Sequence, residues 1–136
     1  MTHEQRIHNE LIAAGVTSYG MKKFAVDYLP KIIHEAEHVM AVVYGRYRDK
    51  SGVSNWNEGF LIATDLRIIF LDHKPGFTTT DELNYDIVSG INLTTAIFSA
   101  VTLRTRTGDY KIRFVNTKCA DIFVNYVEGR RLEKRG

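Results

Sequence analysis

The sequence has little of several features that mark particular classes of protein. Its 136 residues include one cysteine, Cys119, which excludes an internal disulfide and a paired-cysteine metal or redox site. No stretch approaches the ~18 consecutive apolar residues of a membrane-spanning helix. The segment Met1–Arg6 is polar and lacks the apolar core of a signal peptide, so we expect a cytoplasmic protein. The net charge of +2 is too small to indicate nucleic-acid binding by itself.

The chain has the composition of an ordinary folded domain, with 44% hydrophobic and 25% charged residues. Apolar residues at helical spacing predict a helix over residues 4–14 and a second helical pattern from Phe24 to Ile33. Pro30 lacks an N–H group, so we expect it to break or kink the second helix and to leave a separate turn at 30–36.

From His38 onward the pattern becomes typical of β-strands and hairpins. Seven strands are predicted, near residues 38–48, 56–64, 67–73, 77–87, 89–95, 98–107 and 110–115. After the last strand, Asn116 or Thr117 can cap a helix with one apolar face. This order of elements predicts an α+β, mainly β fold, in which a small curved sheet is plugged by its last helix.

The run 59–72 is the most informative part of the chain, because it predicts two strongly apolar strands joined by a turn. A turn with two central residues pairs Phe60 with Leu71 and leaves apolar residues on both faces of the hairpin. A sheet with one wet side alternates apolar and polar residues, so we expect the outer face to be covered by a helix or by a second copy of the chain. The interface residues predicted for a second copy are Phe60, Ile62, Ile69, Leu71 and Trp56.

A wider pattern surrounds this hairpin. It consists of Glu37-x-Val39 leading to Gly45, then Gly59-x-Leu61-x-Ala63-Thr64-Asp65-x-Arg67-Ile68-Ile69-Phe70, then Tyr85-Asp86-Ile87 with Ile91. In these residues the chain resembles the bacterial pleckstrin-homology (PH)-like domain family. The resemblance implies a partly open seven-stranded barrel capped by a C-terminal helix, a role in binding and self-assembly, no catalysis and no cofactor. It predicts an N-terminal helical extension over residues 1–36 and a PH-like domain over residues 37–136.

One motif favours a different function. His34-Glu35-Ala36-Glu37-His38 matches H-E-x-x-H, in which two histidines on one helical face bind zinc and the glutamate acts as a base. The motif requires a continuous helix, but the helical pattern gives way at His38 to a strand-like run. We therefore predict no metal site and keep a zinc-dependent hydrolase only as an alternative.

Cationic residues gather in the last predicted hairpin. A two-residue turn at Gly108-Asp109 would place Arg106 opposite Lys111, and Arg104 opposite Arg113, on one exposed face. Like charges directly opposite each other are mildly destabilising unless an anion lies between them.

A second group of cations follows the first strand. The resemblance to the wider PH fold implies that cations near this loop grip lipid phosphates, although the next strand begins Trp56-Asn57-Glu58 with a carboxylate and no cation. The candidate anion-binding residues of both groups are Arg104, Arg106, Lys111, Arg113, Arg46, Arg48 and Lys50.

These observations predict a non-enzymatic module that self-associates and engages a protein partner or an anionic surface, such as acidic lipid headgroups. We expect it in the cytoplasm or bound peripherally at the inner membrane surface. Generic nucleic-acid binding through the cations is a further alternative, which a steep salt dependence would reveal. The sequence shows no recognition-helix pattern and no row of aromatic residues for sequence-specific nucleic-acid reading. The cationic run at 130–135 is typical of a solubilising tail.

Overall fold

A computed structural model describes residues 1–16, 23–48, 56–74, 77–95, 99–114 and 116–135. Its elements are α1 (His3–Ala13), α2 (Lys23–Ile32), β1 (Val39–Arg48), β2 (Trp56–Thr64), β3 (Ile68–Lys74), β4 (Phe77–Leu83), the 3₁₀ turn η1 (Tyr85–Ile87), β5 (Val88–Thr94), β6 (Ala100–Thr105), β7 (Gly108–Arg113) and α3 (Thr117–Arg135). The predicted order of helices and strands is confirmed. The predicted strand at 77–87 is too long, because the chain turns into η1 after Leu83.

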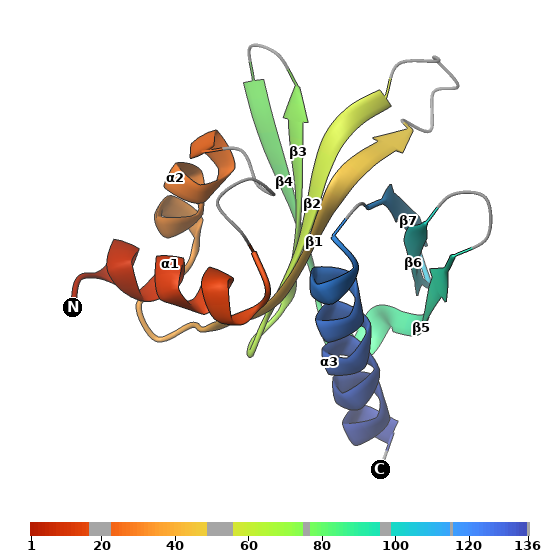
Figure 1. Cartoon of the computed structure of the whole chain (residues 1–136). Coiled ribbons are helices and arrows are strands. Elements are labelled where there is room, and N and C mark those ends of the chain that lie inside the picture. The colour runs from red at the N-terminus through yellow and green to blue at the C-terminus, as the bar shows by residue number, and fades with distance from the viewer. Residues whose placement is uncertain (17–22, 49–55, 75–76, 96–98, 115, 136) are drawn as a thin grey trace.

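The strands of the described residues form one antiparallel sheet in the order β4-β3-β2-β1-β7-β6-β5 (Figure 1). The sheet is not closed, since β4 and β5 lie at its two edges. β1 joins the two halves, and its pairing with β7 places Arg46 opposite Arg113. Gly45 allows this junction, because a Cβ atom there would lie 1.6 Å from the Arg113 carbonyl oxygen. The expected partly open barrel is therefore present, with a close backbone contact where its halves meet.

Each face of the sheet packs against helices. On the inner face, Ala120, Phe123 and Val127 of α3 join a core to which every strand from β1 to β7 contributes, together with Tyr85 of η1. On the outer face, α1 and α2 cover the apolar residues of β1, β2 and β3 (Figure 1). This second core includes Ile7 and Leu11 of α1, Leu29 of α2, and Ile33, which directly follows α2. Among the described residues, no helix is long and apolar enough to span a membrane.

The predicted register of the β2–β3 hairpin is confirmed, with Phe60 opposite Leu71 and Ile62 opposite Ile69. Its outer face is covered by the chain's own helices, which was one of the two alternatives. The four side chains predicted as an interface, Phe60, Ile62, Ile69 and Leu71, are at most 3% exposed and belong to the outer core. They are therefore not a surface on which a second copy can dock in this structure. Self-association itself stays a prediction, and the Trp56 side chain lies outside the described residues.

Pro30 was expected to break or kink the second helix, and the structure shows no break. α2 continues through Pro30 to Ile32, because the proline lies in the last turn and its missing N–H removes only one helical hydrogen bond. A later bond of the same turn is present, from the Ile33 N–H to the Leu29 carbonyl at 3.0 Å. The Pro30 carbonyl oxygen has a hydrogen-bond partner on α1, since it lies 3.1 Å from Nε2 of His3.

The contact at Gly45 predicts a size limit at this position. Gly45→Ala should lower the free energy of unfolding by about 2 kcal/mol or more, because the new methyl group would displace the β7 backbone. Gly129→Ala in α3 is the matched control, since a Cβ atom added there would meet nothing within 4 Å outside its own helix, and it should stabilise the protein by about 0.5–1 kcal/mol. Urea unfolding of the two variants measures both effects, and equal stabilities would contradict the close contact.

The burial of the hairpin predicts that Ile62→Glu unfolds the protein instead of dissociating an oligomer. Ile62 is fully buried in the outer core, and an unpaired carboxylate there should cost about 4 kcal/mol or more. Leu66→Glu, on the exposed turn of the same hairpin, should leave stability nearly unchanged. Circular dichroism and light scattering distinguish the outcomes. If the Ile62→Glu protein is folded and its mass in solution is smaller than that of the wild type, Ile62 lies in an interface between copies of the chain.

Candidate functional site

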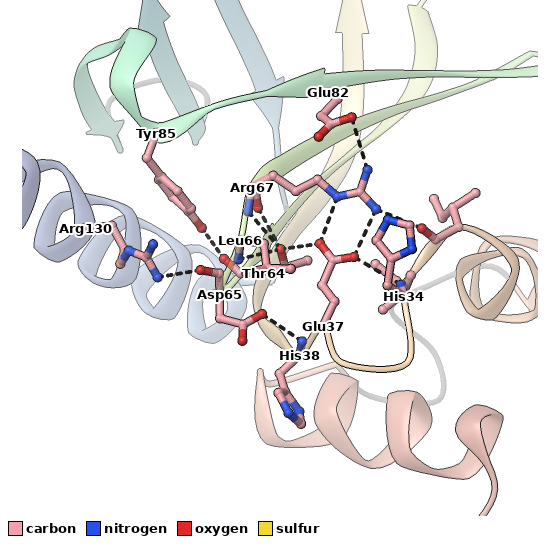
Figure 2. A network of polar contacts seen from close by, with 12 residues as sticks. His34, Glu37, His38, Thr64, Asp65, Leu66, Arg67, Glu82, Tyr85 and Arg130 are labelled. Atoms are coloured by element: carbon pink, nitrogen blue, oxygen red, sulfur yellow. Dashed lines mark hydrogen bonds and ion pairs between the residues drawn. The ribbon is translucent and has the colours of Figure 1, made fainter.

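The turn between β2 and β3 is built around a buried carboxylate, that of Glu37 (Figure 2). Arg67 holds it from two sides, with Nε 2.8 Å from Oε2 and Nη2 3.0 Å from Oε1. The Thr64 hydroxyl donates to Oε2 at 2.6 Å, and the His34 backbone N–H donates to Oε1 at 3.2 Å. Glu37 itself is 0% exposed. The carboxylate is thus fully paired inside the protein, which is the condition under which a buried charge is tolerated.

The same turn is bonded to four further elements of the fold. Arg67 also donates to the Ile32 carbonyl at the end of α2, at 2.9 Å, and forms an ion pair with Glu82 of β4 at 3.3 Å. Tyr85 of η1 donates its hydroxyl proton to the Thr64 carbonyl. Arg130 of α3 donates to the Asp65 carbonyl at 2.7 Å and lies over the Tyr85 ring. The turn therefore connects both helical layers to the sheet.

This network explains why the residues of the family pattern occur together. Glu37 and Tyr85 come from separate parts of the sequence and meet the turn residues Thr64, Asp65 and Arg67 (Figure 2). The sequence pattern contains these residues but does not predict their contacts. The available signal was a carboxylate at the start of one strand and a cation at the start of another. The Glu37 carboxylate and the Arg67 guanidinium stabilise the fold here, since residues of this chain hydrogen-bond both carboxylate oxygens.

The electrostatics of Glu37 follow from this geometry. Burial would raise the pKa of its carboxyl group, but the hydrogen bonds from Arg67, Thr64 and the His34 N–H outweigh burial and lower the pKa to about 2. Glu37 is therefore ionised at neutral pH, as is its partner, because the carboxylate raises the pKa of the Arg67 guanidinium.

The H-E-x-x-H residues do not lie on a helix. α2 ends at Ile32, so His34 and Glu35 lie in the following turn, and His38 immediately precedes β1. The His38 ring contacts Glu10 of α1, with Nδ1 2.8 Å from Oε2, and the fourth residue of the motif is the buried Glu37. Among the described residues, no group of three or more His, Cys, Asp or Glu side chains is placed to hold a metal ion. The helix that this zinc motif requires is therefore missing.

The β6–β7 hairpin differs from its predicted register. Its turn is at Arg106 and Thr107, so Arg104 lies opposite Asp109 and Lys111 lies opposite Thr102. The predicted like-charge pairs, Arg104 with Arg113 and Arg106 with Lys111, are wrong. The turn is fixed by the Thr105 hydroxyl, which donates to the Gly108 carbonyl at 2.6 Å and accepts from the Thr107 N–H at 3.2 Å. The shift is by an even number of residues, so the predicted outward direction of Arg104 and Lys111 is retained, and both are exposed.

A different like-charge pair replaces them. Arg46 of β1 and Arg113 of β7 lie opposite each other, so the two cation groups that sequence analysis treated separately share one face of the sheet. Arg46 also pairs in register with Glu58 of β2, and Arg113 has an interaction within the chain. The residues that face outward together, hereafter the cationic face, are Arg46, Arg104, Lys111 and Arg113.

The other predicted anion-binding residues are not part of this face as described. Arg106 lies in the β6–β7 turn, beside η1. Arg48 ends β1 opposite Trp56, and its side chain is outside the described residues, as is the whole of Lys50.

An open antiparallel sheet of seven strands, with a C-terminal helix against its inner face, defines a PH-like fold. A family model described as "Bacterial PH domain" matches residues 33–129, and the chain therefore belongs to this family. Such domains generally mediate binding or assembly and are typically non-enzymatic.

Two solved structures share the fold. One is the C-terminal domain of an unknown protein from Leishmania infantum, with 14% identity, a TM-score of 0.54, and coverage of 80% of this chain and 95% of that one. The other is a DUF1696 family protein with a pleckstrin-homology domain from Shewanella loihica, with 9% identity, a TM-score of 0.51, and coverage of 79% and 94%. At these identities the likeness shows the fold alone. No curated protein matches the sequence.

The Glu37 network predicts a specific loss of stability in acid. The folded-state pKa of Glu37 is about 2, below its ordinary value of 4.5, so its contribution is complete above pH 4.5 and is lost as the pH falls towards 2. Glu37→Gln should lower the free energy of unfolding at pH 7 by about 3 kcal/mol, because Arg67 loses its buried partner. The variant should also lose less stability than the wild type between pH 4.5 and 2.

Urea unfolding at several pH values measures both effects. Glu35→Gln is the matched control, because Glu35 is exposed two residues away and its substitution should cost less than about 0.5 kcal/mol. Parallel pH profiles of Glu37→Gln and the wild type would show that Glu37 does not carry this acid sensitivity.

Proposed function

We propose that this bacterial PH domain is a non-enzymatic module that binds acidic lipid headgroups at a membrane surface through its cationic face. The observation that carries the proposal is the register of Arg46 against Arg113, which concentrates cations where β1 meets β7. Like charges in this position are mildly destabilising, and a nearby anion relieves the repulsion. Lys111 extends the same face and lies opposite a neutral threonine.

The composition of the face favours a surface of many anions over one specific headgroup. Asp109 lies opposite Arg104 in the β6–β7 register, and Glu58 occupies the register position opposite Arg46 in β2, so acidic residues occur at positions beside the cations. Each cation near an anionic membrane contributes about 1 kcal/mol, so four of them give weak and reversible attachment. Such attachment is screened by salt, because these side chains act from the surface.

Charge reversal of Lys111 tests this proposal. Lys111→Glu should reduce binding to vesicles of phosphatidylglycerol and phosphatidylcholine at low salt by about tenfold, since it replaces an attractive charge by a repulsive one. Stability should hardly change, because Lys111 is exposed and lies opposite Thr102. Cosedimentation with the vesicles measures the bound fraction.

Lys31→Glu is the matched control. It makes the same change in net charge on the exposed surface of α2, which covers a different part of the sheet. It should retain most of the vesicle binding. Equal losses in the two variants would show that net charge, and not the cationic face, governs binding. Failure of the wild type to bind acidic vesicles at low salt would refute the proposal.

A further inference from the structure

A separate pocket of about 370 Å³ opens where η1 and the start of β5 lie against the β6–β7 turn and α3. Two arginines line it, Arg106 from the turn and Arg131 from α3, together with residues 85–89. None of the four residues of the cationic face lines this pocket. Its volume lies at the lower end of the range for small-molecule sites. The pocket is thus a site distinct from the proposed membrane-binding face.

Glu128 holds the guanidinium group of Arg131 through two of its N–H donors. Glu128, one turn earlier in α3, accepts from Nε at 3.2 Å and from Nη2 of Arg131. A guanidinium group has five N–H donors in a planar fork, so donors remain after these two bonds. Glu128 therefore orients the guanidinium, and its other N–H groups form no hydrogen bond within the described residues, on the side chain that lines the pocket.

Arg106 supplies the second cation from a fixed backbone position. Its N–H donates to the Ile87 carbonyl at 3.1 Å, which fastens the β6–β7 turn to η1. Its side chain is exposed and forms no ion pair among the described residues. An unpaired guanidinium at a pocket is available to an incoming anion.

A β-bulge lies at the same place. Val88 pairs with Thr105 and Gly90 pairs with Arg104, so Ser89 is the extra residue left out of the ladder between β5 and β6. The residue left out of a bulge keeps backbone groups outside the regular pairing, and bulges recur beside binding sites. Ser89 therefore adds a hydroxyl, and a backbone position without a partner in the β5–β6 register, to the pocket lining.

The residues that line the pocket include two cations, Arg106 and Arg131, and one carboxylate, Asp86. Asp86 has an interaction within the chain, and Glu128 is bonded to Arg131. Among the described residues, Arg106 is then the pocket cation that forms no ion pair. Two guanidinium groups and a serine are the donors that recognise a phosphate group, because the planar fork of arginine matches two phosphate oxygens. We propose that this pocket binds the phosphate group of a small phosphomonoester, held between Arg106 and Arg131.

Titration of the ¹⁵N-labelled full chain with inorganic pyrophosphate tests the site. The expected result is a saturable shift of the amide signals of Ile87 to Gly90 and of Arg106 and Thr107, absent with sodium chloride at equal ionic strength. Arg106→Gln should weaken binding at least tenfold. Ser89→Asp should abolish binding while leaving both arginines in place, because it adds a carboxylate to the pocket. Arg104→Gln, which alters the cationic face, is the matched control and should bind as the wild type does.

A second arm identifies the source of the phosphate. If Arg106→Gln also loses binding to phosphatidic acid vesicles, the phosphate belongs to a lipid headgroup, and if vesicle binding is retained, the ligand is a soluble phosphomonoester. Three results would overturn the proposal: no saturable shift with pyrophosphate, equal shifts in Arg106→Gln and the wild type, or shifts confined to the cationic face. Because Lys111→Glu tests the membrane face separately, either proposal can fail without the other.

Discussion

The buried ion pair of Glu37 and Arg67 is the interaction on which the arrangement of the other elements depends. A carboxylate at this depth requires a charged partner and several hydrogen bonds. Arg67 immediately precedes β3, and Glu37 lies just before β1, so the pair can form only if the connection from α2 to β1 lies against the β2–β3 turn. That requirement positions α2, and α1 with it, over the outer face of the sheet. The same turn receives Tyr85 and Arg130, which fix the opposite layer.

Covering both faces of one half of the sheet limits where function can reside. The outer face of β1 to β3 is occupied by helices, and the inner face holds α3. Among the described residues, two of the surfaces that these helices leave open carry cations: the face where β1 meets β7 and β6, and the pocket where η1 and β5 meet α3. Charged side chains occur in both places, Lys111 in the first and Arg106 in the second. The division between core and binding surface thus follows from the placement of the helices.

Local features were predictable from the sequence, and pairings between distant segments were not. The β2–β3 register was correct because Thr64 fixes a tight turn, accepting from the N–H groups of Leu66 and Arg67 at 3.1 and 3.0 Å. The β6–β7 register was wrong because Gly108 and Asp109 gave a turn signal, while the Thr105 hydroxyl set the turn two residues earlier. In both hairpins the register is set by a threonine at the first position of the turn, Thr64 in one and Thr105 in the other.

The candidate sites depended on contacts that no local pattern contains. Arg46 and Arg113 share a face only because β1 pairs with β7, and Glu37 is buried only because Arg67, 30 residues away, reaches it. The pocket combines a turn, a bulge and a helix that are separate in sequence. The individual cations were therefore predictable from the sequence, but the residues that lie opposite them in the sheet were not.

The outer core has a consequence for where this domain can be divided. The family match starts at residue 33, after α1 and α2. A polypeptide starting there would keep every strand but would leave Val42, Ile62 and Leu71 facing water, as a contiguous apolar surface of the kind that promotes aggregation. We therefore expect α1 and α2 to belong to the same folding unit as the sheet, and a chain cut at the start of the family match to be less stable than the whole chain.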